Sequence, residues 1–232
     1  MKIGLIGAME VEVQFIRGKL ANPVETVISG IHFFEGELYG KQVVVTQCGV
    51  GKVNAALCTE LLINSFGVTH VINTGVAGGL DSRLSVMDIV VSTDAVHHDM
   101  DAVAFGYAPC QVPGIDTVAF PADEMLIKAV ESAYQKGKEE GRLKHKVIRG
   151  RVASGDVFVN SADKKKKIIE LCGAACCEME GAAVAQVCYL NKVPFAIIRC
   201  VSDLAEHTDE VYKEEEAAAE SSYITDKVIE VL

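Results

Sequence analysis

The stretch spanning residues 176–203 constrains this sequence more than any other. Glu178 and Glu180 open a helix of small residues, and residues 195–201 are then too apolar for anything but a buried strand, which Asp203 ends. A charged group that leaves water is costly unless it is paired or hydrogen-bonded. Acidic side chains at both ends of one helix–strand unit therefore indicate a functional site.

Short apolar runs alternate with helical patterns along the rest of the chain. Strands are expected at residues 3–6, 24–29, 31–38, 43–47, 68–73, 87–92, 146–154 and 195–203, and helices at 9–20, 52–66, 123–138, 162–172, after 180, and at about 209–232. This alternation predicts a single α/β domain over residues 1–232 with a parallel or mixed sheet.

Glycine-rich or acidic segments follow several of these strands. They come after Ile6, Asn73, Ser154 and Val201. Ligands of open α/β sheets bind beyond the carboxyl ends of the strands. These segments therefore predict one shared pocket.

The composition limits the classes of binding partner and the cellular compartment that can be expected. Lys and Arg number 22 and Asp and Glu 32, which gives a net charge of −10, and an acidic surface argues against nucleic acid or an anionic membrane as partner. The eight cysteines are scattered through apolar runs without a CxxC pair. Together with the absence of a signal-peptide pattern or a run of about 20 apolar residues, this predicts a cytoplasmic protein with reduced thiols.

The segment Gly49–Lys52 resembles a phosphate-binding loop in its glycines and its lysine. A P-loop needs a glycine where this chain has Thr46 and a serine or threonine where it has Val53. A dinucleotide fingerprint would need a glycine at Asn54. Neither motif is present.

Two further charged clusters predict no site. The spacing of His97, His98, Asp99 and Asp101 matches no metal signature, so no metal or other cofactor is expected. The run Lys164–Lys167 lies on a predicted helix and is interpreted as its solvated face.

Glu12, Glu180, Asp203 and Arg199 remain as candidates, and each has a structural alternative. Arg199 and Asp203 would share one face of a strand, so they could form a structural ion pair. Glu12, in the first turn of a helix, could be a solvated acid that favours the helix dipole.

Six blocks of the sequence together resemble the 5′-methylthioadenosine/S-adenosylhomocysteine nucleosidases. The blocks are Ile6–Glu12, Gly49–Lys52, Asn73–Gly79, Ser154–Phe158, Glu178–Glu180 and Arg199–Asp203. Their order and approximate spacing match the family from residue 1 to about 205. The resemblance implies a three-layer α/β/α fold of the nucleoside phosphorylase/hydrolase type around a central mixed, twisted sheet. It also implies a homodimer and hydrolysis of the N-glycosidic bond to adenine and a 5-thioribose.

The resemblance also assigns roles by position. Glu12 activates water, Asp203 protonates adenine N7, Ser202 orients Asp203, and Arg199 helps to place the water. Glu180 binds the ribose hydroxyls. The resemblance assigns no catalytic role to Glu178; we expect it to face away from Glu180 along the extended segment and to serve the structure around Met179. The other expected binding residues are Ala8, Met9, Val50, Gly78, Phe158, Val159 and Met179, with Phe105, Tyr107 and Pro113 in the 5′ pocket of a neighbouring subunit.

One position departs from the family pattern. Val76 stands where the family usually has a serine that helps to hold the attacking water. A valine side chain cannot form that hydrogen bond, so water placement would fall to Glu12 and Arg199.

Three other functions stay open at this point. A purine nucleoside phosphorylase would need cationic phosphate ligands, and a phosphate facing Glu12 would be repelled. A futalosine-type nucleoside hydrolase would use the same acid–base pair with another 5′ pocket. A non-catalytic nucleoside-binding relative would not need a water-activating base.

Overall fold

The computed structural model describes residues 1–206 and 213–232. The strands are β1 Lys2–Gly7, β2 Ala21–Ile28, β3 Ile31–Leu38, β4 Lys41–Gln47, β5 His70–Gly79, β6 Ile89–His97, β7 Phe120–Pro121, β8 Val147–Ser154, β9 Cys176–Glu178 and β10 Phe195–Asp203. The α-helices are α1 Glu10–Arg17, α2 Lys52–Asn64, α3 Glu124–Glu139, α4 Ala162–Cys172, α5 Gly181–Asn191 and α6 Glu214–Val231, and Val103–Phe105 forms a short 3₁₀ turn.

All ten strands belong to one mixed sheet. β1 lies between β4 and β5 and is parallel to both. At one edge, β2, β3 and β4 form two antiparallel hairpins, as the glycine-containing breaks between these strands predict. The predicted mixed sheet is confirmed.

Five strands of the sheet close on themselves. β5 pairs with β10, β10 with β6, β6 with β8, β8 with β9, and β9 returns to β5. The apolar side chains of these strands therefore fill the space inside a ring, where Val71, Val90, Val152 and Ile197 are fully buried. A ring of paired strands leaves no free edge between its members.

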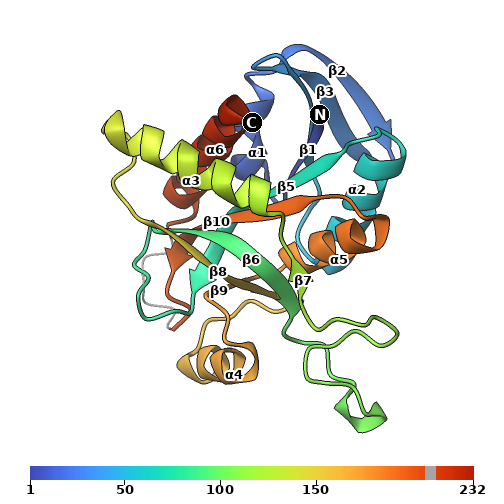
Figure 1. Cartoon of the computed structure of the whole chain (residues 1–232), viewed down its shortest axis with the longest axis vertical. Coiled ribbons are helices and arrows are strands. Elements are labelled where there is room, and N and C mark those ends of the chain that lie inside the picture. Colours follow the sequence, from blue (N-terminus) through green and yellow to red (C-terminus); the bar gives the residue numbers. More distant parts are fainter. Residues whose placement is uncertain (207–212) are drawn as a thin grey trace.

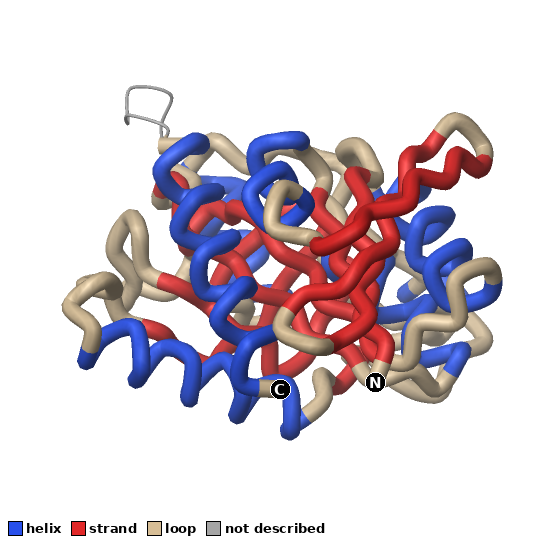
Figure 2. The backbone as a smooth tube through the Cα atoms, turned by 90° about the horizontal axis from the view of Figure 1, so that it is seen from above, coloured by secondary structure: helices blue, strands red, loops and turns tan. Residues whose placement is uncertain are grey.

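Helices cover the sheet on two sides, which confirms the three-layer α/β/α architecture (Figures 1 and 2). On one side α6 packs against α1, α3, β5 and β10. On the other side α2 packs against α5. Helix α1 shows why the sequence folds this way, since its apolar side chains at Val13 and Ile16 are one turn apart and both are buried.

The helix boundaries follow local signals. Asp123 accepts a hydrogen bond from the backbone N–H of Leu126 at 3.0 Å and is the N-cap of α3. Helix α4 spans the predicted residues and ends at Gly173, which has the left-handed conformation common after helices. The predicted start of the last helix, near residue 209, lies outside the described residues.

The strand ends differ more from the prediction. β5 continues to Gly79, six residues beyond the predicted end at Asn73, because β10 pairs with the glycine-rich segment as far as Gly78. β6 continues to His97, five residues beyond the predicted end. The two shortest strands, β7 and β9, have too few residues to show a period and were not predicted.

All eight cysteines are free thiols, and only Cys172 is not fully buried. Among the described residues, no helix has both the length and the apolar composition that a membrane span requires.

Candidate active site

A cavity of about 240 Å³ opens where β1, β5 and β10 end. It is lined by Ala8, Met9, Glu12, Val50, Val76, Gly78, Phe158, Glu178, Met179, Glu180, Arg199, Ser202 and Asp203. The lining residues come from the segments that follow β1, β4, β8 and β9 and from the strands β5, β9 and β10 themselves. Ligands of open α/β sheets bind beyond the carboxyl ends of strands, as expected here.

Glu12 lies in the first turn of α1 but is buried, with 1% of its surface exposed. Its carboxylate turns back to accept hydrogen bonds from the backbone N–H groups of Ala8 at 2.7 Å and Met9 at 2.9 Å. The other oxygen, Oε1, accepts from the N–H of Val76 at 3.0 Å. The alternative interpretation of Glu12 as a solvated acid is therefore wrong.

Gly75 makes room for this carboxylate. A Cβ atom at position 75 would lie 2.3 Å from Oε1 of Glu12 and 2.4 Å from Nη1 of Arg199. Distances below 3.0 Å are not compatible with a real side chain. Only glycine at this position allows the carboxylate and the guanidinium to approach the same piece of backbone.

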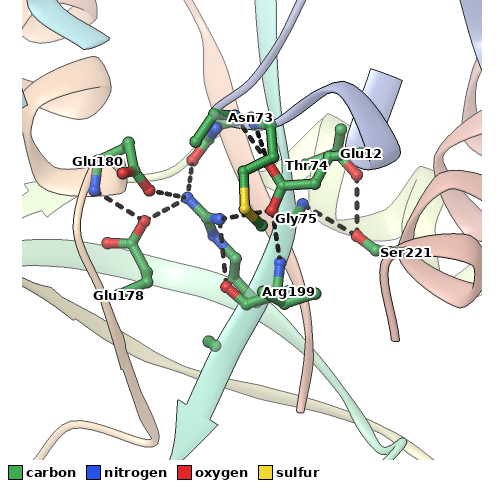
Figure 3. A network of polar contacts seen from close by, with 12 residues as sticks. Glu12, Asn73, Thr74, Gly75, Glu178, Glu180, Arg199 and Ser221 are labelled. Carbon is green, nitrogen blue, oxygen red and sulfur yellow. Dashed lines mark hydrogen bonds and ion pairs between the residues drawn. The ribbon is translucent and has the colours of Figure 1, made fainter. Parts of the chain in front are cut away.

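Arg199 is the centre of a buried charge cluster (Figure 3). It contacts three carboxylates: Nη2 donates to Glu178 and lies 3.5 Å from Glu180, while Nη1 lies 3.9 Å from Oε1 of Glu12. Nη2 also donates to the side-chain oxygen of Asn73 at 2.6 Å. The arginine therefore fixes the relative positions of the three acids.

Glu178 shares this guanidinium with Glu180, so the expectation that the two acids face opposite ways is wrong. Its carboxylate also accepts hydrogen bonds from the N–H groups of Glu180 and Gly181 at 2.8–3.1 Å and from the hydroxyl of Ser154. A negative charge is favourable at a helix N-terminus. Glu178 therefore caps α5 and holds the segment around Met179, which agrees with the structural role expected for it.

The cluster holds more negative than positive charge, and its pKa values reflect this. Burial raises the pKa of Glu12 above its ordinary value of 4.5, although Arg199 and the three backbone N–H groups oppose the shift. Burial and the neighbouring Glu178 raise the pKa of Glu180 to about 7. Burial alone would lower the pKa of Arg199, but the carboxylates outweigh it and raise the pKa further.

Asp203 lies at the end of β10, which pairs with β5, as β1 does. Ser202 Oγ lies 2.9 Å from Oδ2 of Asp203, and the N–H of Ala205 donates to Oδ1 at 2.8 Å. The pairing of β10 with β5 is irregular between Val201 and Asp203. Strand alternation breaks at this bulge, so Arg199 and Asp203 do not share a face. Arg199 is paired with the three glutamates, so the structural alternative of an Arg199–Asp203 ion pair is wrong.

Helix α6 supports the site from behind. Ser221 Oγ accepts a hydrogen bond from the N–H of Gly75 at 3.1 Å and lies 2.8 Å from the hydroxyl of Thr74 (Figure 3). The adjacent Ser222 donates to the backbone oxygen of Glu12 at 2.8 Å. Nothing in the sequence pattern links these serines to residues 146 or more positions away, and they were not predicted as part of the site.

The structure places eleven of the predicted site residues around the cavity. Val159 is not among them: its side chain is 6% exposed and belongs to an apolar cluster with Ile168 on α4. Phe105, Tyr107 and Pro113 lie in the segment between β6 and β7, which extends away from the body of the molecule in Figure 1. Among the described residues, no group of three or more His, Cys, Asp or Glu side chains is placed to hold a metal ion.

Comparison with known proteins agrees with this geometry. The model of the phosphorylase superfamily matches residues 2–230. A 5′-methylthioadenosine/S-adenosylhomocysteine nucleosidase of Psychromonas ingrahamii is 45% identical over 236 residues, which cover 99% of this chain and 98% of the relative. The chain belongs to the phosphorylase superfamily, among its 5′-methylthioadenosine/S-adenosylhomocysteine nucleosidases.

Solved structures of the superfamily superpose along the whole chain. The nucleosidase of Neisseria meningitidis in complex with methylthio-immucillin-A has a TM-score of 0.94 at 37% identity, covering 100% of this chain and 99% of that one. A futalosine hydrolase of Helicobacter pylori has a TM-score of 0.91 at 30% identity, covering 100% and 98%. The backbone of the superfamily is therefore shared by hydrolases that act on different nucleosides.

Proposed function

We propose that this chain hydrolyses the N-glycosidic bond of 5′-methylthioadenosine and S-adenosylhomocysteine, releasing adenine and the 5-thioribose. This places the chain in the recycling of the by-products of S-adenosylmethionine chemistry. The single observation that carries the proposal is that Glu12, which follows β1, and Asp203, which ends β10, line one cavity. The names and covered lengths of the relatives support the choice of substrate.

In the proposed reaction, Glu12 accepts a proton from the attacking water. The three backbone N–H groups hold its carboxylate in one orientation. Oε1 lies 3.9 Å from Nη1 of Arg199, so the guanidinium is near enough to orient the same water. General base catalysis of this kind contributes typically about 10²–10⁴-fold.

Asp203 donates a proton to N7 of adenine as the bond to the ribose breaks. Adenine is a poor leaving group as an anion, and protonation allows it to leave neutral. The hydroxyl of Ser202 contacts Oδ2 of Asp203 and orients the carboxyl group. An acid and a base on opposite sides of the ribose, with room for water, resemble the arrangement in inverting O-glycoside hydrolysis.

Glu180 binds the ribose hydroxyls. One of its oxygens accepts from the N–H of Gly51 at 2.9 Å and the other faces Arg199, so the carboxylate is held before substrate arrives. Met179 and Val50 line the same cavity and pack against the sugar and its 5′ substituent. Phe158, which is 56% exposed, covers adenine.

A homodimer completes the 5′ pocket in this proposal. Phe105 is 84% exposed and lies in the segment that extends from the molecule. A large exposed aromatic side chain on a projecting segment is suited to a partner's surface. Sedimentation velocity, followed by the KM of Phe105→Ala for methylthioadenosine, tests this: a monomeric wild type would contradict the dimer.

The function itself is tested by incubating the purified protein with each nucleoside in phosphate-free buffer and identifying the products. Release of adenine and the free thioribose is expected. A requirement for phosphate would indicate a phosphorylase instead. Among the described lining residues Arg199 is the only cation, and it is already paired with carboxylates, so phosphate is not expected to bind.

A futalosine-type nucleoside is the alternative substrate. The Helicobacter pylori futalosine hydrolase shares the fold, and the same acid–base pair would serve. The ratio of kcat/KM for the two nucleosides decides between them. Tight adenosine binding without any turnover would indicate the non-catalytic alternative.

A further inference from the structure

One of the four lysines of α4 differs from its neighbours. The run Lys164–Lys167 was predicted to be a solvated face, and Lys164, Lys166 and Lys167 are indeed exposed. The side chain of Lys165 is only 13% exposed, whereas that of Lys166 is 75% exposed. Lys165 therefore contacts protein where its neighbours contact water.

The contacts of Lys165 are with the segment that follows the proposed acid. Its Nζ donates to the backbone oxygen of Leu204 at 2.8 Å and to Oε1 of Glu206 at 2.8 Å. Glu206 is 44% exposed, and a salt bridge to a solvated carboxylate contributes little by itself. The additional bond to a main-chain oxygen fixes the backbone of the residue next to Asp203.

This segment is a turn that needs support. Ala205 has φ +57°, a left-handed conformation that residues other than glycine seldom adopt. Such residues persist where the surroundings hold them. Ala205 is 1% exposed and shares a buried apolar cluster with Ile168 of α4. Helix α4 therefore supports this segment through the ammonium group of Lys165 and through the apolar cluster that Ile168 and Ala205 share.

The backbone of residues 204–205 orients the carboxyl group of Asp203. The N–H of Ala205 donates to Oδ1 of Asp203 at 2.8 Å, and this bond exists only with the backbone at residues 204–205 in its observed conformation. We infer that Lys165 is a positioning residue: by binding the carbonyl of Leu204, it holds the Ala205 N–H that orients the Asp203 carboxyl toward the leaving base. The inference rests on the proposed function.

The test compares turnover with binding of an analogue that lacks the acceptor. The variants are Lys165→Met, Lys165→Arg and the exposed control Lys166→Met. For each, kcat and KM are measured with methylthioadenosine, together with the Ki of its 7-deaza analogue, which has no N7 to accept a proton. Thermal unfolding is recorded in parallel.

For Lys165→Met we expect kcat to fall about tenfold, since small misplacements of a catalytic group cost one to two orders of magnitude. The Ki of the 7-deaza analogue should change less than about twofold because that ligand does not use the Asp203 contact. Lys165→Arg should recover most of the activity, and Lys166→Met should match the wild type.

An unchanged kcat in Lys165→Met would overturn the inference. So would a parallel loss of kcat and of analogue affinity, or a failure of both Lys165→Met and Lys165→Arg to fold, because either would make the role of Lys165 purely structural. A wild-type protein that binds the analogue but releases no adenine would contradict the proposed function instead, and the two failures are thus distinct.

Discussion

The backbone of Gly75 lies so close to the carboxylate of Glu12 that a Cβ atom there would come within 2.3 Å of Oε1. That Cβ atom would also lie 2.4 Å from Nη1 of Arg199. One glycine on β5 therefore determines whether the proposed base and the central arginine can face the same cavity.

Gly75→Ala should abolish most activity, because the added methyl group displaces both charged side chains. We expect kcat/KM to fall at least about 100-fold and stability to fall by about 1–3 kcal/mol from overpacking. Gly18→Ala is a suitable control, since its Cβ would meet no atom closer than 3.3 Å. Near-normal turnover in Gly75→Ala would show that the Glu12 carboxylate can move without loss of function.

Glu12→Gln should lower kcat by about 10²–10⁴-fold, since the amide cannot accept a proton from water. In the wild type, Glu12 must be ionised to act. Because burial raises its pKa above 4.5, kcat/KM should decline as the pH falls through a value above the ordinary carboxyl range. The control is Glu10→Gln, on the same helix but paired with Arg17; an equal loss in both variants would contradict the assignment.

Asp203→Asn should reduce kcat by about 10²–10⁴-fold with little change in KM, because an amide cannot protonate the leaving base. Ser202→Ala should have a smaller effect of the same kind, since it removes one orienting contact. Single-turnover release of adenine measures the chemical step directly. If Asp203→Asn retained near-normal turnover of methylthioadenosine, the acid role would be wrong.

Ionisation of Glu180 should lower the free energy of unfolding as the pH rises. Its pKa is about 7 in the folded protein against an ordinary value of 4.5, so between these values the folded state holds a proton that the unfolded state has released. The free energy of unfolding therefore falls from about pH 4.5 to 7, by on the order of 2 kcal/mol. Urea denaturation at several pH values should show this slope in the wild type and lose it in Glu180→Gln. The same slope in both proteins would assign the proton to another group.

Val76→Ser tests the position that departs from the family. Its N–H and C=O already bind Glu12 and Arg199 through the backbone, so the side chain can change without disturbing them. A hydroxyl added at the cavity wall should raise kcat about 2–10-fold through one more hydrogen bond to water. Val76→Ala controls for size. An unchanged rate in the serine variant would show that water placement here needs no hydroxyl.

Local sequence signals were sufficient for most of the fold. Helix caps such as Asp123 and buried helix positions such as Val13 act within a few residues, and the elements that depend on them were predicted correctly. The end of β5 was not, because glycines that would favour a turn in isolation are held extended by pairing with β10. Pairing between distant strands overrides local preference.

In the candidate site, too, some features could be predicted from the sequence and others depend on contacts between distant segments. Motif resemblance identified the side chains around the cavity, but the contacts of Arg199 could not be derived from its own strand. The bulge before Asp203 turns the two residues apart, and Glu178 comes from a short strand that joins the ring from elsewhere. The support from Ser221 and Ser222 depends on the docking of α6, which no short-range pattern encodes.

The three neighbouring parallel strands β1, β5 and β10 set the spacing of the chemistry, since paired strands lie about 4.8 Å apart. Glu12 follows the first, Gly75 and Val76 belong to the second, and Arg199 and Asp203 to the third. The groups that would contact the variable 5′ end, in contrast, lie on connecting segments. A change confined to the connecting segments would therefore alter the 5′ pocket and leave the strands in place, which agrees with the backbone that a methylthioadenosine nucleosidase and a futalosine hydrolase share.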